Sequence, residues 1–234
     1  GVGEANSPWG PAKPKIGGWE SRSNDLDKTI PSKYLMDDMF GIFASVNPRT
    51  GYAKDPRMEA LMKPRKGADG RTAFRYLECN IGMDASAKES HYPDLYCASP
   101  LNTTDETVNP YTKNDGYIPL FLTEELMLIK AEALYWKGDK TGSREWTVKA
   151  VEKSFERFNC NPKYTGNYLK DVAYLPETDF NIGHIMRQKY VCMYLQPEIW
   201  TDMRRYNYSN DKNGITYDGI TIYPTLKRPY NLYE

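Results

Sequence analysis

The sequence has few of the residues on which most metal and catalytic sites depend. Only two histidines occur in its 234 residues, His91 and His184, and they lie far apart. The four cysteines are spread from Cys79 to Cys192 without a Cys-x-x-Cys pair, a spacing that matches neither a zinc motif nor a short disulfide framework. A histidine-based metal centre or catalytic triad is therefore disfavoured, and we expect free thiols, no metal and no cofactor.

The sequence also lacks net charge and long apolar runs. Lysine plus arginine and aspartate plus glutamate each number 31, so the formal charge is zero. A neutral chain has no overall attraction for nucleic acid, and we expect no nucleic-acid partner. No stretch approaches the roughly 18 consecutive apolar residues of a membrane-spanning helix.

Aromatic residues, by contrast, are abundant, with 19 tyrosines, 7 phenylalanines and 5 tryptophans. Such rings serve either in a core that provides hydrogen-bond partners for their polar ends or on a surface that stacks against flat, hydroxylated ligands, and we expect both uses. A site for such ligands needs exposed rings flanked by polar side chains, and rings in loops are the best candidates, although rings that plug the core beneath loops are the alternative. The candidate ligand-binding residues are Trp9, Trp19, Tyr92, Tyr96, Tyr111 and Tyr117.

The first half of the chain is predicted to be rich in loops. A helix is expected after Ser32, but between residues 48 and 119 turn dipeptides such as Asp69-Gly70 recur. Short strands are expected there, the clearest over Thr72–Cys79. A loop region of this length within a compact domain often binds ligands; a packed surface excursion is the alternative.

The second half is predicted to be helical. A helix begins at Thr123 and is expected to be mostly buried, with Gly138 in a left-handed cap after its last turn. A second helix is expected from near Ser143 to Asn161, after a turn that includes residues 140–146, and a third from Ile182 to Gln196. The apolar residues at helical spacing in the first two are Leu126, Ile129, Ala133, Trp136, Val148, Val151, Phe155 and Phe158.

The segment 198–206 combines a tryptophan, two carboxylates and paired arginines within about two helical turns. Glu198 and Asp202 are four residues apart, and arginine side chains can fork onto carboxylates or exposed carbonyl groups. Ion-pair networks are commoner than active sites, so a structural clamp is favoured over a catalytic centre. The residues assigned to this structural role are Trp200, Asp202, Arg204 and Arg205.

Several landmarks resemble, in order, the SusD/RagB family of outer-membrane nutrient-binding lipoproteins. They are Asp55-Pro56-Arg57-Met58, then Leu128-Ile129-Lys130-Ala131-Glu132-Ala133-Leu134 with Gly138-Asp139, then Arg187-Gln188-Lys189, the segment 198–205 and Leu226-Lys227-Arg228-Pro229-Tyr230. The resemblance implies a mainly α fold with long loops, in which tetratricopeptide-like helix pairs join a loop-rich part with short strands. The whole chain is then one incomplete SusD-like domain: a loop-rich part (1–122), a helical part (123–206) and a C-terminal loop (207–234).

The resemblance also implies a function. Such proteins are not enzymes; they capture glycans or peptides at the cell surface and pass them to a SusC-like TonB-dependent transporter. We expect the chain to be the C-terminal portion of a protein held at the outer membrane by an N-terminal lipid that this chain does not contain. The alternative is a tetratricopeptide-type scaffold that binds only proteins, while a glycoside hydrolase would need two carboxylates across a cleft.

Overall fold

A computed structural model describes residues 31–32, 34–35, 55–62, 65–66, 72–73, 119–170, 176, 178–209, 216–217 and 219–223. The chain divides into two compact units. The first unit contains helix α2 (Met58–Leu61) and the short antiparallel strands β1 (Arg65–Lys66) and β2 (Thr72–Ala73). In their register Arg65 pairs with Ala73. Strand β2 begins where a strand was predicted; the rest of that prediction lies outside the described residues.

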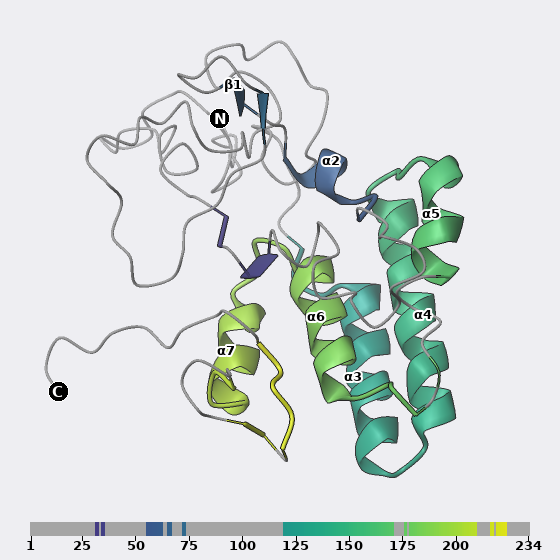
Figure 1. Ribbon diagram of the computed structural model, residues 1–234, viewed down its shortest axis with the longest axis vertical. Helices are drawn as coiled ribbons and strands as arrows, with labels where there is room; N and C mark the ends of the chain where they lie inside the picture. Colours follow the sequence, from purple (N-terminus) through teal and green to yellow (C-terminus); the bar gives the residue numbers. More distant parts are fainter. Residues whose placement is uncertain are drawn as a thin grey trace, which may run out of the picture. The chain divides into compact units, whose positions relative to one another are not determined.

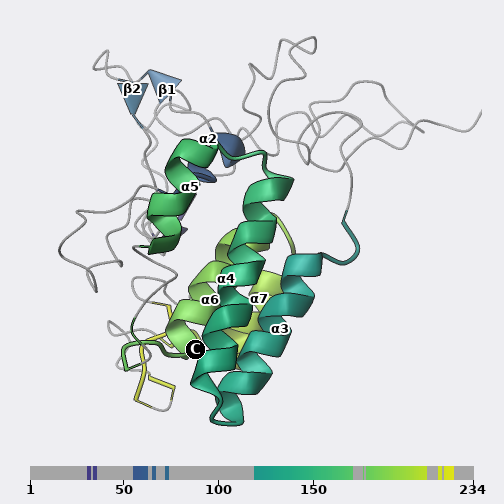
Figure 2. The same cartoon turned by 90° about the vertical axis from the view of Figure 1, so that its right-hand side faces the viewer.

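The second unit contains the long helices, drawn in teal and green in Figure 1. Helices α3 and α4 run antiparallel side by side, and α6 packs against both (Figures 1 and 2). The predicted mainly α fold class is confirmed, whereas the division into parts at residues 122 and 206 stays a prediction. The helices of this unit are α3 (Thr123–Trp136), α4 (Lys140–Arg157), α5 (Pro162–Tyr168), α6 (Ile182–Cys192) and α7 (Glu198–Arg205).

The turn between α3 and α4 is shorter than predicted. Gly138 has a φ of +85° and closes α3 in the expected left-handed conformation. Asp139 then caps α4, because its carboxylate accepts a hydrogen bond of 2.8 Å from the Gly142 N–H. Residues 140–146 therefore belong to the helix, and their assignment to the turn was wrong. The serine expected to start the helix, Ser143, is instead buried and donates to the carbonyl of Ala131 in α3 at 2.6 Å.

Helix α3 is not mostly buried, contrary to the prediction. Leu128 is fully buried, but Leu126 on another side of the helix is 59% exposed and Ile129 is 46% exposed. The helix is apolar on nearly every side, so periodicity alone could not select the inward face. Glu124 and Glu132 are buried, because each forms an ion pair with an arginine from another helix. The pairing of these two acids fixes which side of α3 faces inward.

Side-chain caps define two further helix starts. Asn161 caps α5, with Pro162 as its first residue. Helix α5 was not predicted, because Asn161 was expected only to end the preceding helix. Asn181 caps α6 in a reciprocal capping box with His184, and α6 ends at Cys192, earlier than predicted. At the predicted early helix, Ser32 Oγ accepts from the Leu35 N–H at 3.2 Å; most of that helix lies outside the described residues.

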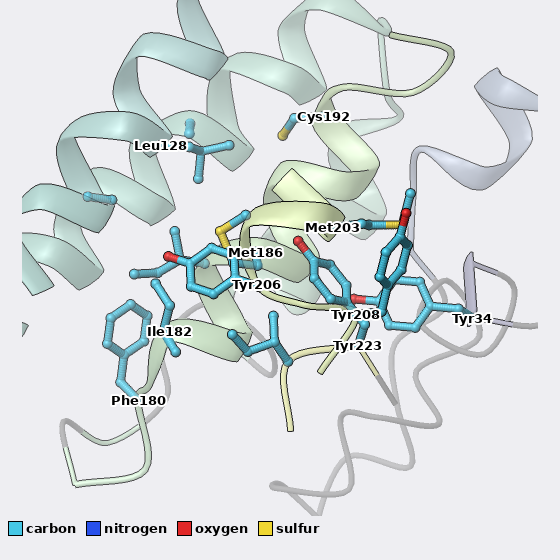
Figure 3. Close-up of a cluster of buried hydrophobic side chains, with 14 residues drawn as sticks. Tyr34, Leu128, Phe180, Ile182, Met186, Cys192, Met203, Tyr206, Tyr208 and Tyr223 are labelled. Atoms are coloured by element: carbon cyan, nitrogen blue, oxygen red, sulfur yellow. The ribbon is translucent and has the colours of Figure 1, made fainter. Parts of the chain in front are cut away.

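The main core of the second unit contains many tyrosines. Tyr34 lies edge-on to Tyr223, with ring centroids 5.7 Å apart, and Tyr206 and Tyr208 are also buried. Figure 3 shows these rings beside Met203 and Met186. The core use of the surplus tyrosines is therefore confirmed. The stripe predicted for α4 is buried as well: Val148, Val151, Phe155 and Phe158.

Candidate functional site

The six aromatic residues predicted to contact a ligand lie outside the described residues. They are Trp9, Trp19, Tyr92, Tyr96, Tyr111 and Tyr117, and their role stays a prediction. The second unit, called the helical unit below, contains two charged clusters and one exposed aromatic pair. Their geometry indicates whether the unit is suited to catalysis or to binding.

The first cluster surrounds Arg57, whose side chain is completely buried. The Asp55 carboxylate accepts two hydrogen bonds from the guanidinium: Nη2 lies 2.6 Å from Oδ2, and Nε lies 2.9 Å from Oδ1. The spacing of two residues suits this arrangement, since the Arg57 backbone N–H also donates to Oδ1 at 2.9 Å. The guanidinium additionally donates to four buried side chains from α4, α5 and α6, namely Ser154, Tyr168, Gln188 and Cys192.

The Arg57 cluster has the properties of a structural tie. Burial by itself lowers the pKa of Arg57, but the charge and hydrogen bonds of Asp55, together with the neighbouring Tyr168 and Cys192, outweigh burial, and the pKa lies above its ordinary value. The guanidinium therefore stays charged, and its N–H groups donate hydrogen bonds to other groups of the protein. Phe155 and Tyr168 also lie close to the guanidinium, at 5.5 and 5.6 Å from ring centroid to carbon. The cluster therefore joins three helices through one cation.

The second cluster joins α3, α6 and α7. Arg205 donates to Glu132 through both terminal nitrogens and to Asp202 Oδ1 at 2.7 Å. Asp202 also pairs with Lys189 of α6, with Nζ 2.7 Å from Oδ2, and the Tyr206 hydroxyl donates to Glu132. Both carboxylates are largely buried, so the two cations balance the two charges where water is scarce.

Glu132 in this cluster is poorly suited to acid–base catalysis. Burial raises the pKa of Glu132, but the hydrogen bonds from Arg205 and Tyr206, together with the positive charges of Arg205 and Lys189, outweigh burial, and the pKa lies below its ordinary value. A general acid needs a raised pKa and access to substrate, whereas Glu132 is held ionised by protein donors. The arrangement is that of an ion-pair network.

The four residues predicted to form the structural clamp have different environments in the structure. Asp202 is buried and Arg205 is bound to two carboxylates, but Arg204 is exposed. Trp200 is 46% exposed and meets Tyr208 edge-on at 5.7 Å. Glu132 and Tyr206 complete the network, and neither role was predicted from the sequence. The position of Glu132 within a mostly apolar run was the available signal.

We expect substitution of the adjacent Arg204 and Arg205 to have very different effects on the free energy of unfolding. Arg205→Ala leaves Glu132 and Asp202 without their shared cation and should lower the free energy of unfolding by about 1–3 kcal/mol. Arg204→Ala, the matched control, removes an exposed side chain and should change it by less than about 0.5 kcal/mol. Chemical denaturation at pH 7 measures both. Equal effects of the two substitutions would refute the assignment of Arg205 as the clamping residue.

Two further features bear on function. Among the residues that the structure describes, no group of three or more His, Cys, Asp or Glu side chains is arranged to hold a metal ion. None of the described helices is both long enough and apolar enough to cross a bilayer.

Comparison with known proteins gives one informative result. No curated protein and no solved structure matches the chain. The profile of the SusD-like family described as "starch-binding associating with outer membrane" matches residues 19–221. The match covers most of the chain, including both charged clusters and the helices that they join. With its mainly helical fold, the chain belongs to this SusD-like family, whose members are described as binding starch and associating with the outer membrane.

Proposed function

We propose that this protein is a non-catalytic receptor that captures glycans at the cell surface and delivers them to a SusC-like TonB-dependent transporter. The observation that carries the proposal is the family match over residues 19–221. The family description gives glycan binding at the outer membrane; delivery to a transporter and the lipid anchor are parts of the proposal.

The chemistry of the helical unit supports a binding role. Its buried carboxylates Glu132 and Asp202 are ion-paired with Arg205 rather than placed opposite each other across an open cleft. A pair of acids at a set separation on either side of the sugar is what glycoside hydrolysis requires. The aromatic surplus of the sequence supplies the flat apolar faces on which sugar rings stack.

Isothermal titration calorimetry of the purified chain tests the proposed ligand class. The panel contains amylopectin, maltoheptaose, a β-linked glucan, a mannan and a set of unrelated peptides. We expect saturable binding to at least one glycan, with no release of reducing ends during prolonged incubation. Peptide binding without glycan binding would favour the protein-interaction scaffold, and turnover of any glycan would refute the non-catalytic assignment.

The transporter is tested separately, in the native cells. Mild chemical cross-linking followed by purification of the full-length protein should recover a TonB-dependent barrel protein, and metabolic labelling with a fatty-acid analogue should mark the receptor. Recovery of the receptor without the barrel, under conditions that preserve other outer-membrane complexes, would contradict delivery to a transporter.

A further inference from the structure

The helical unit carries an exposed aromatic pair that neither charged cluster uses. Trp136 at the end of α3 is 45% exposed, and Tyr217 is 39% exposed. Their ring centroids are 5.8 Å apart and their planes meet at 68°, so one ring presents its edge to the other. The two rings come from segments about 80 residues apart in the sequence. Singly exposed apolar residues are normal on a folded unit, whereas exposed rings that lie together can form part of a binding surface.

The tryptophan contacts two tyrosine rings. Its ring centroid lies 5.2 Å from that of Tyr135 and 5.8 Å from that of Tyr217. Tyr217 in turn packs edge-on to Tyr206, with centroids 4.8 Å apart, and the Tyr206 hydroxyl is bound to Glu132. Because an indole is apolar apart from its single N–H, the exposed part of Trp136 is mostly apolar ring.

The tyrosine is held by a tight turn. Tyr217 and Ile220 exchange two backbone hydrogen bonds of 3.0 Å each. Gly219 in this turn has a φ of +73°, a conformation that glycine adopts without strain. Both rings of the pair are therefore held by contacts with their own unit, which reduces the ordering of side chains that ligand binding would require.

A charged residue lies one ring away from the pair. The half-exposed Arg205 guanidinium lies over Tyr206, 4.5 Å from its centroid, and Tyr206 packs against Tyr217. Its terminal nitrogens already donate to Glu132, Asp202 and Tyr206, so the contact that the pair offers is apolar ring. Such rings are complementary to the C–H face of a pyranose.

We propose that Trp136 and Tyr217 form a second glycan-contact surface on the helical unit, in addition to the aromatic residues predicted in the loop-rich part. The inference rests on the proposed glycan-binding function and adds a site to it. A long polysaccharide that touched both surfaces would bind more tightly than a short oligosaccharide, because the second contact becomes intramolecular.

Substitution of the two rings tests the surface. We expect Trp136→Ala and Tyr217→Ala each to weaken amylopectin binding by the full chain about three- to tenfold. The matched controls are Trp200→Ala, which removes a tryptophan of nearly equal exposure, and Tyr164→Ala, which removes an exposed tyrosine of α5. Both controls should bind within about twofold of wild type. Thermal unfolding of every variant shows whether it is folded.

A second measurement does not depend on the alanine variants. Trp136→Phe keeps an aromatic face but removes the indole, so it should bind amylopectin nearly as well as wild type while losing part of the ligand-induced change in tryptophan fluorescence. If wild type binds a glycan and all variants bind it equally with unchanged fluorescence, the second surface is refuted and the proposed function stands. If wild type binds no glycan, the proposed function itself fails. Competition at these rings by a proline-rich peptide, but by no glycan, would overturn the inference in favour of a peptide surface.

Discussion

Asp55→Ala should destabilise the helical unit by about 3–5 kcal/mol, one of the largest effects expected of any single substitution in this chain. The substitution removes the only carboxylate that forks onto the buried Arg57 within the described part of the chain. Arg57 cannot lose its proton at accessible pH, so a full positive charge would remain where no water can solvate it. Partial unfolding of the contacts among α4, α5 and α6 is the expected way to relieve that charge.

A double substitution distinguishes two contributions to the free energy of unfolding: the cost of leaving Arg57 unpaired and the net stabilisation by the ion pair. Asp55→Ala combined with Arg57→Met removes both charges and keeps much of the buried volume. Replacing a buried ion pair by apolar residues is often neutral or stabilising, so the double variant should recover a large part of the lost stability. Equilibrium denaturation of the two single variants and the double variant gives the coupling free energy between the residues.

An exposed pair on α4 is the matched control. Lys153 and Glu156 form an ion pair with a distance of 2.6 Å, as short as the contact of Asp55 with Arg57, but both of its side chains are exposed. Exposed pairs contribute only about 0–1 kcal/mol, so Glu156→Ala should change stability little. If Asp55→Ala proved as mild as Glu156→Ala, then Arg57 would not be the buried centre that the structure shows.

Local sequence signals predicted the bounds of α3, the start of α6 and the buried stripe of α4, but neither α5 nor the inward face of α3. Gly138 and the run from Thr123 gave the end and the start of α3, because caps and termini depend on a few neighbouring residues. The inward face of α3 was mispredicted because it is set by the partners of Glu124 and Glu132, which come from α4 and α7. Such partners are distant in sequence, and no periodicity encodes them.

The charged centres show the same limit. Asp55-Pro56-Arg57 was recognised only as part of a family resemblance, since nothing in three neighbouring residues indicates a buried cation shared by three helices. The pair formed by Trp136 and Tyr217 was also missed. Trp136 was read as part of a buried stripe, and the turn that presents Tyr217 lies in a segment predicted only as loop.

The buried His184 should make the free energy of unfolding decrease as the pH falls. Burial, reinforced by the charge of Arg187, lowers the pKa of His184 from 6.5 to about 3. Its Nδ1 accepts a hydrogen bond from the Asn181 N–H at 3.1 Å, and among the described residues no partner meets Nε2, which is buried. Protonation in the folded state would put an N–H on Nδ1 directly opposite the Asn181 N–H, and this hydrogen bond would be lost.

The sign of the effect follows from this depressed pKa. Above pH 6.5 the imidazole is neutral in both states and contributes no pH dependence. Between pH 6.5 and about 3 the unfolded chain takes up a proton that the folded chain does not, so the free energy of unfolding falls by up to about 1.4 kcal/mol per pH unit. The total loss from this residue is on the order of 3–5 kcal/mol.

His184→Gln isolates this contribution, because glutamine at the third helical position can accept the same capping hydrogen bond without titrating. The variant should match wild type within about 1 kcal/mol at pH 7 and lose less stability between pH 6.5 and pH 4, as measured by urea denaturation at each pH. The sequence has only two histidines, so NMR can follow the His184 ring directly, and its signals should stay unchanged down to about pH 4. A titration midpoint near 6.5 would show that the imidazole is hydrated in the folded protein, and it would refute the role of His184 in acid sensitivity.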